Sequence, residues 1–187
     1  MRFHAKPLAI PEVILITPKR YADARGYFME TYRASDFAAL GIAAGFVQDN
    51  QAASVERGTV RGLHFQRPPA AQAKLIRTLK GAIFDVAVDM RKGAKTYGQW
   101  VGATLTSEGG EQLFVPRGFA HGYCTLDFGT TVAYKCDAYY APDHEGGIYF
   151  ADPSLAIDWP IATNEAILVD RDRNFPPFRD IDSPFVV

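Results

Sequence analysis

A series of short apolar runs separated by turn residues restricts the fold of this sequence more than any other feature. Eight runs follow one another between residues 46 and 140 and read FVQDNQAASV, TVRGLHF, KLIRTLKG, AIFDVAVDM, GQWVGATLT, EQLFVP, HGYCTL and TVAYKCDAYY. Strands that recur at intervals of about ten residues, with no helical segment between them, indicate a sandwich or a barrel. Residues 83–89 have an apolar bias on both alternating faces, which predicts a strand covered on both sides.

The two ends of the chain add a few more predicted elements. Residues 12–17 and 27–32 favour strands, with a turn between them. Ser35 is expected to be the N-cap of a short helix that Gly41 ends, and a second short helix is expected near residues 164–168. We therefore expect an all-β fold with a few short peripheral helices.

Composition excludes several classes of function. The net charge of −1 provides no basic surface for nucleic acid or for an acidic membrane. The first residues lack the apolar stretch of a signal peptide, and no later run is long enough to span a bilayer. Cys124 and Cys136 lie in predicted strands, and we interpret them as buried thiols of a cytoplasmic protein. No linker or shift in composition divides the 187 residues, so a single domain, residues 1–187, is expected.

The segment from Gly58 to Gly81 contains the first candidate site. Arg61, His64 and Lys74 stand there among apolar residues in a strand-like pattern. Charged or titratable groups on a buried β surface need partners, because an unpaired buried charge is costly. A bound anionic ligand and a proton-transfer reaction would explain them. An exposed basic strand face is the alternative explanation.

A second motif favours the first explanation. Residues 110–121, GEQLFVPRGFAH, resemble the second motif of the cupin superfamily of double-sheet jelly rolls, and residues 58–81 resemble the first. Cupins usually bind a metal through three histidines and a glutamate. Here Gln66 occupies the second ligand position and Lys74 the position of the glutamate. A lysine repels a divalent cation, and the two remaining histidines make a poor site, so we expect no bound metal.

The same residues form a coherent set for proton transfer next to a ketone. Such a reaction needs a base of near-neutral pKa, a donor to the enolate oxygen and an acid for the returning proton. His64 is the candidate base. Lys74 or His121 could donate to the oxygen, and Tyr134 is a candidate acid on another predicted strand. Asp172 could orient His64 and stabilise its imidazolium. The alternative for Tyr134 is a core tyrosine with a satisfied hydroxyl.

The chain resembles one family over most of its length. From residue 23 to residue 176 it contains, in order, DARGYFMETY, QDNQ, VRGLHFQ, AQAKLIR, GFAHGY, YKCDAYYAP, DPSLAIDWP and RDRNFP. Together these motifs resemble the dTDP-4-dehydrorhamnose 3,5-epimerases, the RmlC-type sugar-nucleotide epimerases of the cupin superfamily. The resemblance implies a double-sheet jelly roll that uses neither a metal nor a cofactor.

The resemblance also implies roles for individual residues. His64 would be the proton-abstracting base, Asp172 its paired aspartate, and Tyr134 the acid on the opposite face. Lys74 and His121 would line the sugar near its C4 oxygen. The other substrate contacts would be Arg25, Glu30, Gln48, Asn50 and Arg61 for the nucleotide and diphosphate, Tyr140 for stacking on thymine, and Glu145 and Arg171.

Two further implications concern assembly and local departures. The family forms a homodimer in which strands near the N-terminus cross to the partner, so Arg25 and Glu30 are expected to serve the partner's site. Val169 and Arg171 stand where the family usually has Ser and Lys, which keeps the charge but changes the local contact. Thr125 replaces an asparagine that follows the second cupin motif.

The activity implied is that of an isomerase. It would convert dTDP-4-dehydro-6-deoxy-D-glucose to dTDP-4-dehydro-L-rhamnose by inverting C3 and C5, which both flank the C4 ketone. Epimerisation at C3 alone, or of another nucleotide-linked 4-keto sugar, is the alternative within the family. A metal-dependent cupin oxygenase would need ligands at Gln66 and Lys74. A non-catalytic sugar-nucleotide binder would have no use for His64, Tyr134 and Asp172 together.

Overall fold

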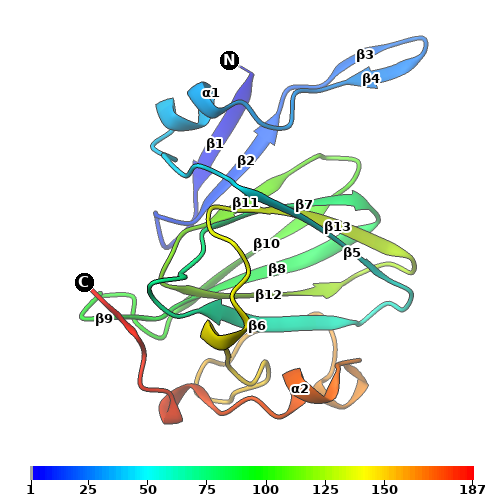
Figure 1. Ribbon diagram of the computed structural model, residues 1–187. Helices are drawn as coiled ribbons and strands as arrows, with labels where there is room; N and C mark the ends of the chain where they lie inside the picture. Colours follow the sequence, from blue (N-terminus) through cyan, green and yellow to red (C-terminus); the bar gives the residue numbers. More distant parts are fainter. Residues whose placement is uncertain (1) are drawn as a thin grey trace.

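The computed structural model describes residues 2–187 and contains two antiparallel sheets that pack face to face (Figure 1). The six-stranded sheet has the order β1 (Phe3–Pro7), β2 (Ile14–Pro18), β11 (Gln112–Val115), β7 (Lys74–Lys80), β13 (Thr130–Cys136) and β5 (Gln48–Ser54). The five-stranded sheet has the order β10 (Trp100–Thr106), β8 (Ala82–Asp89), β12 (Phe119–Thr125), β6 (Val60–Gln66) and β14 (Glu145–Gly147). The predicted all-β double-sheet fold is confirmed.

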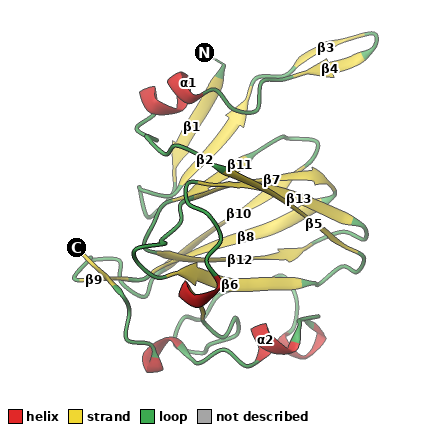
Figure 2. Cartoon of the chain, in the orientation of Figure 1, coloured by secondary structure: helices red, strands yellow, loops and turns green. Residues whose placement is uncertain are grey.

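The remaining elements are short and lie outside the two sheets (Figure 2). Two strand pairs are formed by β3 (Tyr21–Asp23) with β4 (Gly26–Phe28), and by β9 (Arg91–Lys92) with β15 (Phe185–Val186). The helices are α1 (Ala34–Ala39), α2 (Asp170–Arg173) and the 3-10 turns η1 (Pro142–His144), η2 (Thr163–Glu165) and η3 (Phe178–Asp180). Within residues 2–187, none of these helices combines the length and apolar character needed to cross a membrane.

The core lies on both sides of β8, as its sequence predicted. Ile83 and Ala87 belong to the cluster between the two sheets, where Ile76 and Val132 of the six-stranded sheet also pack. Val86 belongs to a second cluster on the outer face of the five-stranded sheet. Alternate residues of β8 therefore enter different apolar layers, which explains why this strand is apolar on both faces.

The C-terminal third of the chain covers the outer face of the five-stranded sheet. Leu155 and Phe185 are buried against Leu63 and Val88 there. The outer face of the six-stranded sheet is partly covered by the segment that contains α1, through Phe37. The helix α2 lies beneath β6 (Figure 1). A cavity is lined by residues of α2 and of strands from both sheets.

Several local predictions were wrong. The helix α1 starts at Ala34 and has Arg33 as its N-cap, with no side-chain capping bond, so Ser35 already lies inside it. The extended backbone of Arg33 explains the earlier start. The strand expected at residues 27–32 ends at Phe28, and the helix expected at residues 164–168 is the single turn η2. The run at residues 131–140 leaves the sheet at Cys136, so its final tyrosines lie in a loop.

The hairpin of β3 and β4 projects away from the sandwich (Figure 1). Its two strands pair only with each other. At its base the guanidinium of Arg20 stacks on the ring of Tyr27, 4.0 Å from the centroid, and donates to the carbonyl of Ser107 at 2.6 Å. Phe28 is nevertheless 65% exposed, which is unusual for a large apolar side chain.

Candidate active site

Two histidines face each other across neighbouring strands of the five-stranded sheet. His64 on β6 is the cross-strand partner of His121 on β12. Glycines on both strands allow this close pairing: a Cβ atom on Gly62 would lie 2.5 Å from Cα of Gly122. Gly62 also has φ of +141°, which side-chain-bearing residues rarely adopt. The sequences RGLH and AHGY therefore bring the two imidazoles into one site.

The six-stranded sheet supplies the opposite wall. Lys74 on β7 pairs with Cys136 on β13, and Tyr134 lies two residues earlier on the same face of β13. With the two histidines, Lys74 and Tyr134 line a cavity of about 480 Å³. The predicted site residues around this cavity are Arg61, His64, Lys74, His121, Tyr134, Tyr140, Glu145, Arg171 and Asp172.

The short helix α2 brings a buried carboxylate to His64. Oδ1 of Asp172 lies 2.9 Å from Nε2 of His64, and Oδ2 accepts the backbone N–H of Gly62 at 3.2 Å. Although burial raises the pKa of Asp172, the hydrogen bond from His64 and the other donors outweigh it and hold this pKa below its usual value. An ionised Asp172 accepts a hydrogen bond from the Nε2–H of His64, so Nδ1 carries no proton and is the nitrogen of His64 that can accept one.

Burial shifts three other groups of the cavity toward their uncharged forms. Burial lowers the pKa of His64, Asp172 raises it, and the charges of Lys74 and Arg171 lower it further. The net result is a pKa below the usual histidine value. Burial likewise lowers the pKa of Lys74 and raises that of Tyr134. At neutral pH the site therefore contains a neutral imidazole that can accept a proton and a phenol that can donate one.

A chain of polar contacts runs from the imidazole toward the outside of the cavity. Nε of Arg171 donates to Oδ1 of Asp172 at 3.1 Å, and its Nη1 donates to Oε2 of Glu145 at 2.9 Å. The same Oε2 accepts the hydroxyl of Tyr140 at 3.0 Å. Nη2 of Arg171 lies 3.3 Å from Nε2 of His64. Arg171 thus connects the histidine–aspartate pair with an exposed aromatic ring.

A second cavity of about 250 Å³ adjoins the first and shares His64, Lys74 and Tyr134 with it. Of these two cavities, Gln48 and Asn50, on the edge strand β5, line the second and not the first. Nε2 of Gln48 donates to Oδ1 of Asn50 at 3.0 Å. These two amides therefore extend the polar lining away from the histidine pair.

The remaining charged residues predicted for the site divide into two groups. Arg61 lies at the mouth of the larger cavity and donates to Oγ of Ser54 at 3.2 Å. Arg25 lies in the projecting hairpin, where its side chain is 90% exposed and paired with Asp23. Glu30 pairs with Arg2 and Arg33, and neither Arg25 nor Glu30 lines either cavity. Arg25 and Glu30 therefore do not reach the candidate site of their own chain.

Sequence reasoning missed Asp85, which lies behind His121. Its Oδ1 is 2.7 Å from Nε2 of His121, and its side chain has no exposed surface. Its Oδ2 has no hydrogen-bond partner within residues 2–187. The signal was present in the run IFDVAVD, because an aspartate in a strand covered on both faces needs a partner.

Two of the four cupin ligand positions carry side chains that do not suit a metal. His121 is bonded through Nε2 to Asp85, and Lys74 contributes an amine. The carboxamide of Gln66 is bonded to the backbone, to the carbonyls of Ala70 and Tyr139 and to the N–H of Ala141. An amine and an amide already engaged with the backbone do not fit the ligand preferences of a divalent metal.

Comparisons with known proteins agree on one family. The model of the family described as dTDP-4-dehydrorhamnose 3,5-epimerase matches residues 7–180. The enzyme of that name from Sinorhizobium fredii is 47% identical over 178 residues, which cover 95% of this chain and 91% of the relative. The dTDP-4-dehydrorhamnose 3-epimerase of Streptomyces niveus is 41% identical over 170 residues, which cover 90% of this chain and 81% of the relative.

A solved structure has the same fold. The dTDP-6-deoxy-D-glucose-3,5-epimerase of Legionella pneumophila, in complex with dTDP-4-keto-L-rhamnose, superposes with a TM-score of 0.92 at 42% identity. The match covers 96% of this chain and 95% of that one. A family model that spans nearly the whole sequence, close relatives and a shared fold lead to one conclusion: this chain belongs to the dTDP-4-dehydrorhamnose 3,5-epimerase family of isomerases.

Proposed function

We propose that this chain inverts C3 and C5 of dTDP-4-dehydro-6-deoxy-D-glucose and forms dTDP-4-dehydro-L-rhamnose, with His64 as base and Tyr134 as acid. Epimerisation is the activity of the family to which the chain belongs. The observation that carries the residue assignment is the 2.9 Å contact between Nε2 of His64 and the buried Asp172, in a cavity that Tyr134 also lines.

The reaction begins at the carbon next to the C4 ketone. Nδ1 of His64 removes the proton from C3 or C5, and the electron pair of the broken C–H bond forms an enolate with its charge on O4. Lys74 and His121 stabilise that oxygen from the two sheets. Tyr134 then delivers a proton to the opposite face of the carbon, which inverts it. Exchange with water then removes the proton from His64 and restores the one on Tyr134, and a ring flip presents the second carbon to the same four residues.

The rest of the substrate is held outside this reaction centre. Arg61 binds the diphosphate, Gln48 and Asn50 contact the nucleotide, and the ring of Tyr140 stacks on the thymine. Glu145 and Arg171 complete the contacts between the aromatic ring and the reacting sugar. Binding energy from these distant groups positions the sugar for proton transfer.

The proposal includes a homodimer in which the β3–β4 hairpin crosses to the partner. Tyr27 and Phe28 are exposed on a hairpin that leaves its own sandwich (Figure 1), which supports a partner surface. Arg25 at the tip of this hairpin and Glu30 beyond it would then complete the nucleotide site of the other subunit. The two free thiols, Cys124 and Cys136, are compatible with the further proposal of a cytoplasmic location.

Epimerisation at C3 alone is the second candidate, and the 3-epimerase of Streptomyces niveus favours it. The test for both is proton NMR of the dTDP-linked 4-keto sugar incubated with the purified protein in D₂O. The proposed function predicts deuterium at C3 and C5 and a product with both centres inverted. Exchange and inversion at C3 only would establish the second candidate, and no exchange at either carbon would refute both.

A further inference from the structure

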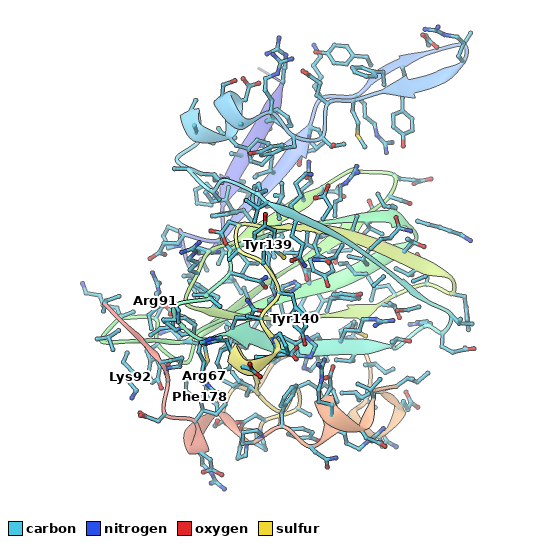
Figure 3. The ribbon with its side chains drawn as sticks, viewed as in Figure 1. Arg67, Arg91, Lys92, Tyr139, Tyr140 and Phe178 are labelled. Atoms are coloured by element: carbon cyan, nitrogen blue, oxygen red, sulfur yellow. The ribbon has the colours of Figure 1, made fainter. Side chains whose placement is uncertain are left out.

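The backbone of the loop that carries Tyr140 is held by hydrogen bonds from side chains. In a sheet, a neighbouring strand would make these bonds. Tyr139 and Tyr140 follow β13 and precede η1, in front of the sandwich (Figure 3). Four backbone groups of this segment, residues 138–141, bond to glutamine side chains. The segment is flanked by ordinary backbone bonds, from Asp137 to Ala73 and from His144 to Ala141. Over these residues, glutamine carboxamides therefore take the place of the backbone hydrogen bonds that an adjacent strand would supply.

Gln66 makes the most extensive of these contacts. Its Nε2 donates to the carbonyl of Tyr139 at 3.2 Å, and its Oε1 accepts the N–H of Ala141 at 2.8 Å. The same Nε2 donates to the carbonyl of Ala70 at 2.7 Å. A carboxamide carries a donor and an acceptor, so Gln66 bonds the residues on both sides of Tyr140 as the peptide group of an adjacent strand would. The side chain of Gln66 is buried.

Two more glutamines hold the neighbouring groups. Oε1 of Gln48 accepts the N–H of Tyr140 at 2.8 Å. Nε2 of Gln72 donates to the carbonyl of Ala138 at 2.8 Å. Gln48 lies on β5, while Gln66 ends β6 and Gln72 precedes β7. The segment is thus tied to both sheets at once, next to the cavity that all three glutamines line.

We propose that Gln66 and Gln72 are positioning residues for Tyr140, and that their carboxamides fix the aromatic ring in its binding position before the nucleotide arrives. This inference rests on the proposed role of Tyr140 in nucleotide binding. A loop that is ordered in advance loses less conformational freedom when the ligand binds, which increases affinity. It also assigns a use to the amide at the second cupin ligand position, because this backbone clamp requires a donor and an acceptor in one side chain, a combination that a metal-bound histidine does not offer.

The test replaces the amide donor by a carboxylate of the same shape. In Gln66→Glu and Gln72→Glu an oxygen faces the carbonyl that the amide formerly bound, so repulsion replaces a hydrogen bond. Amide hydrogen exchange of Tyr140 and Ala141 is measured by NMR in the ligand-free protein, and the Kd of dTDP is measured by calorimetry. We expect both exchange rates and the Kd to rise by about tenfold, the effect of roughly one lost hydrogen bond.

Gln99→Glu is the matched control, because exposed Gln99 also donates its amide to a backbone carbonyl, that of Lys95, far from this loop. It should leave the exchange of Tyr140 and Ala141 unchanged. Gln72 is only half-buried, so its variant tests the segment even if a carboxylate at the enclosed position of Gln66 prevents folding.

Exchange rates at Tyr140 and Ala141 that match the control in both variants would overturn the inference. Faster exchange without any change in the Kd of dTDP would confirm that the glutamines hold the loop, but would refute the assignment of Tyr140 to the nucleotide. The two claims can therefore fail separately.

Discussion

Nε2 of His121 lies 2.7 Å from Oδ1 of Asp85, a carboxylate with no exposed surface on the neighbouring strand β8. If His121 donates to O4 of the substrate, it must do so through Nδ1, because Nε2 already faces Asp85. Asp85 thus fixes the orientation of the His121 ring through Nε2, which leaves Nδ1 as the nitrogen available to the charge that develops on O4.

The first prediction is that Asp85→Asn lowers kcat by about 10²–10³-fold, the typical effect of losing one oxyanion donor. The amide has nearly the same shape but no charge, so the KM for the nucleotide sugar should change much less than kcat. Steady-state kinetics, with circular dichroism as a check on folding, measures both. An unchanged kcat would assign oxyanion stabilisation to Lys74 alone.

The second prediction concerns the pH dependence of kcat/KM. The base must be neutral, so kcat/KM falls as the pH drops through the pKa of His64. The charge of Arg171 lowers this pKa, so Arg171→Gln should raise it and move the acid limb of the kcat/KM profile to higher pH. Arg171→Lys keeps the charge and is the control. Coincident acid limbs for Arg171→Gln and the unmodified protein would exclude this effect.

The third prediction tests whether the hairpin acts across the dimer. Arg25→Ala should raise KM by an amount worth about 1.5–3 kcal/mol, the range for a charged hydrogen bond. His64→Ala should be inactive. In a heterodimer of the two variants, a crossing hairpin leaves one site with both residues intact, so half of the activity should return with a normal KM. A heterodimer with the raised KM of Arg25→Ala would place the hairpin in its own subunit's site.

The fourth prediction concerns stability. Ala156 has φ of +47°, the one non-glycine residue with positive φ among residues 2–187. Relief of about 1–2 kcal/mol of strain outweighs the added chain entropy of glycine, so Ala156→Gly should raise the free energy of unfolding by about 0.5–1 kcal/mol.

The matched control for this prediction is Ala162→Gly, because Ala162 is also exposed but has an ordinary φ of −66°. It should lower the free energy of unfolding by about 0.4–1 kcal/mol. Chemical denaturation measures both variants. A loss of stability in Ala156→Gly as large as that in Ala162→Gly would show that Ala156 is not strained.

The sequence predicted the strands well because their apolar periodicity reflects the two core layers. It failed where side chains act on the backbone. Tyr139 and Tyr140 have high β propensity, so the strand was expected to continue through them. Their backbone groups instead bond to Gln48 and Gln66, contacts between residues distant in the sequence. Propensity contains no information about such partners.

The candidate site was predicted only in part for a similar reason. His64 and Asp172 are 108 positions apart. The periodicity of apolar residues cannot indicate a contact over that separation, so the prediction that they pair depended on the family resemblance. Asp85 was missed because it was treated only as part of the apolar pattern of its strand. The rule that a buried charge needs a partner would have identified it.

The central claim is that His64 acts as the base and Tyr134 as the acid, and deuterium incorporation in D₂O tests it most directly. His64→Ala should abolish incorporation at C3 and C5, because no enolate forms without the base, a loss of about 10²–10⁴-fold. Tyr134→Phe keeps the ring and removes the acid. Substrate protons should still exchange through His64, while inversion, above all at C5, is lost. Normal formation of the doubly inverted product by Tyr134→Phe, or continued exchange by His64→Ala, would contradict the account.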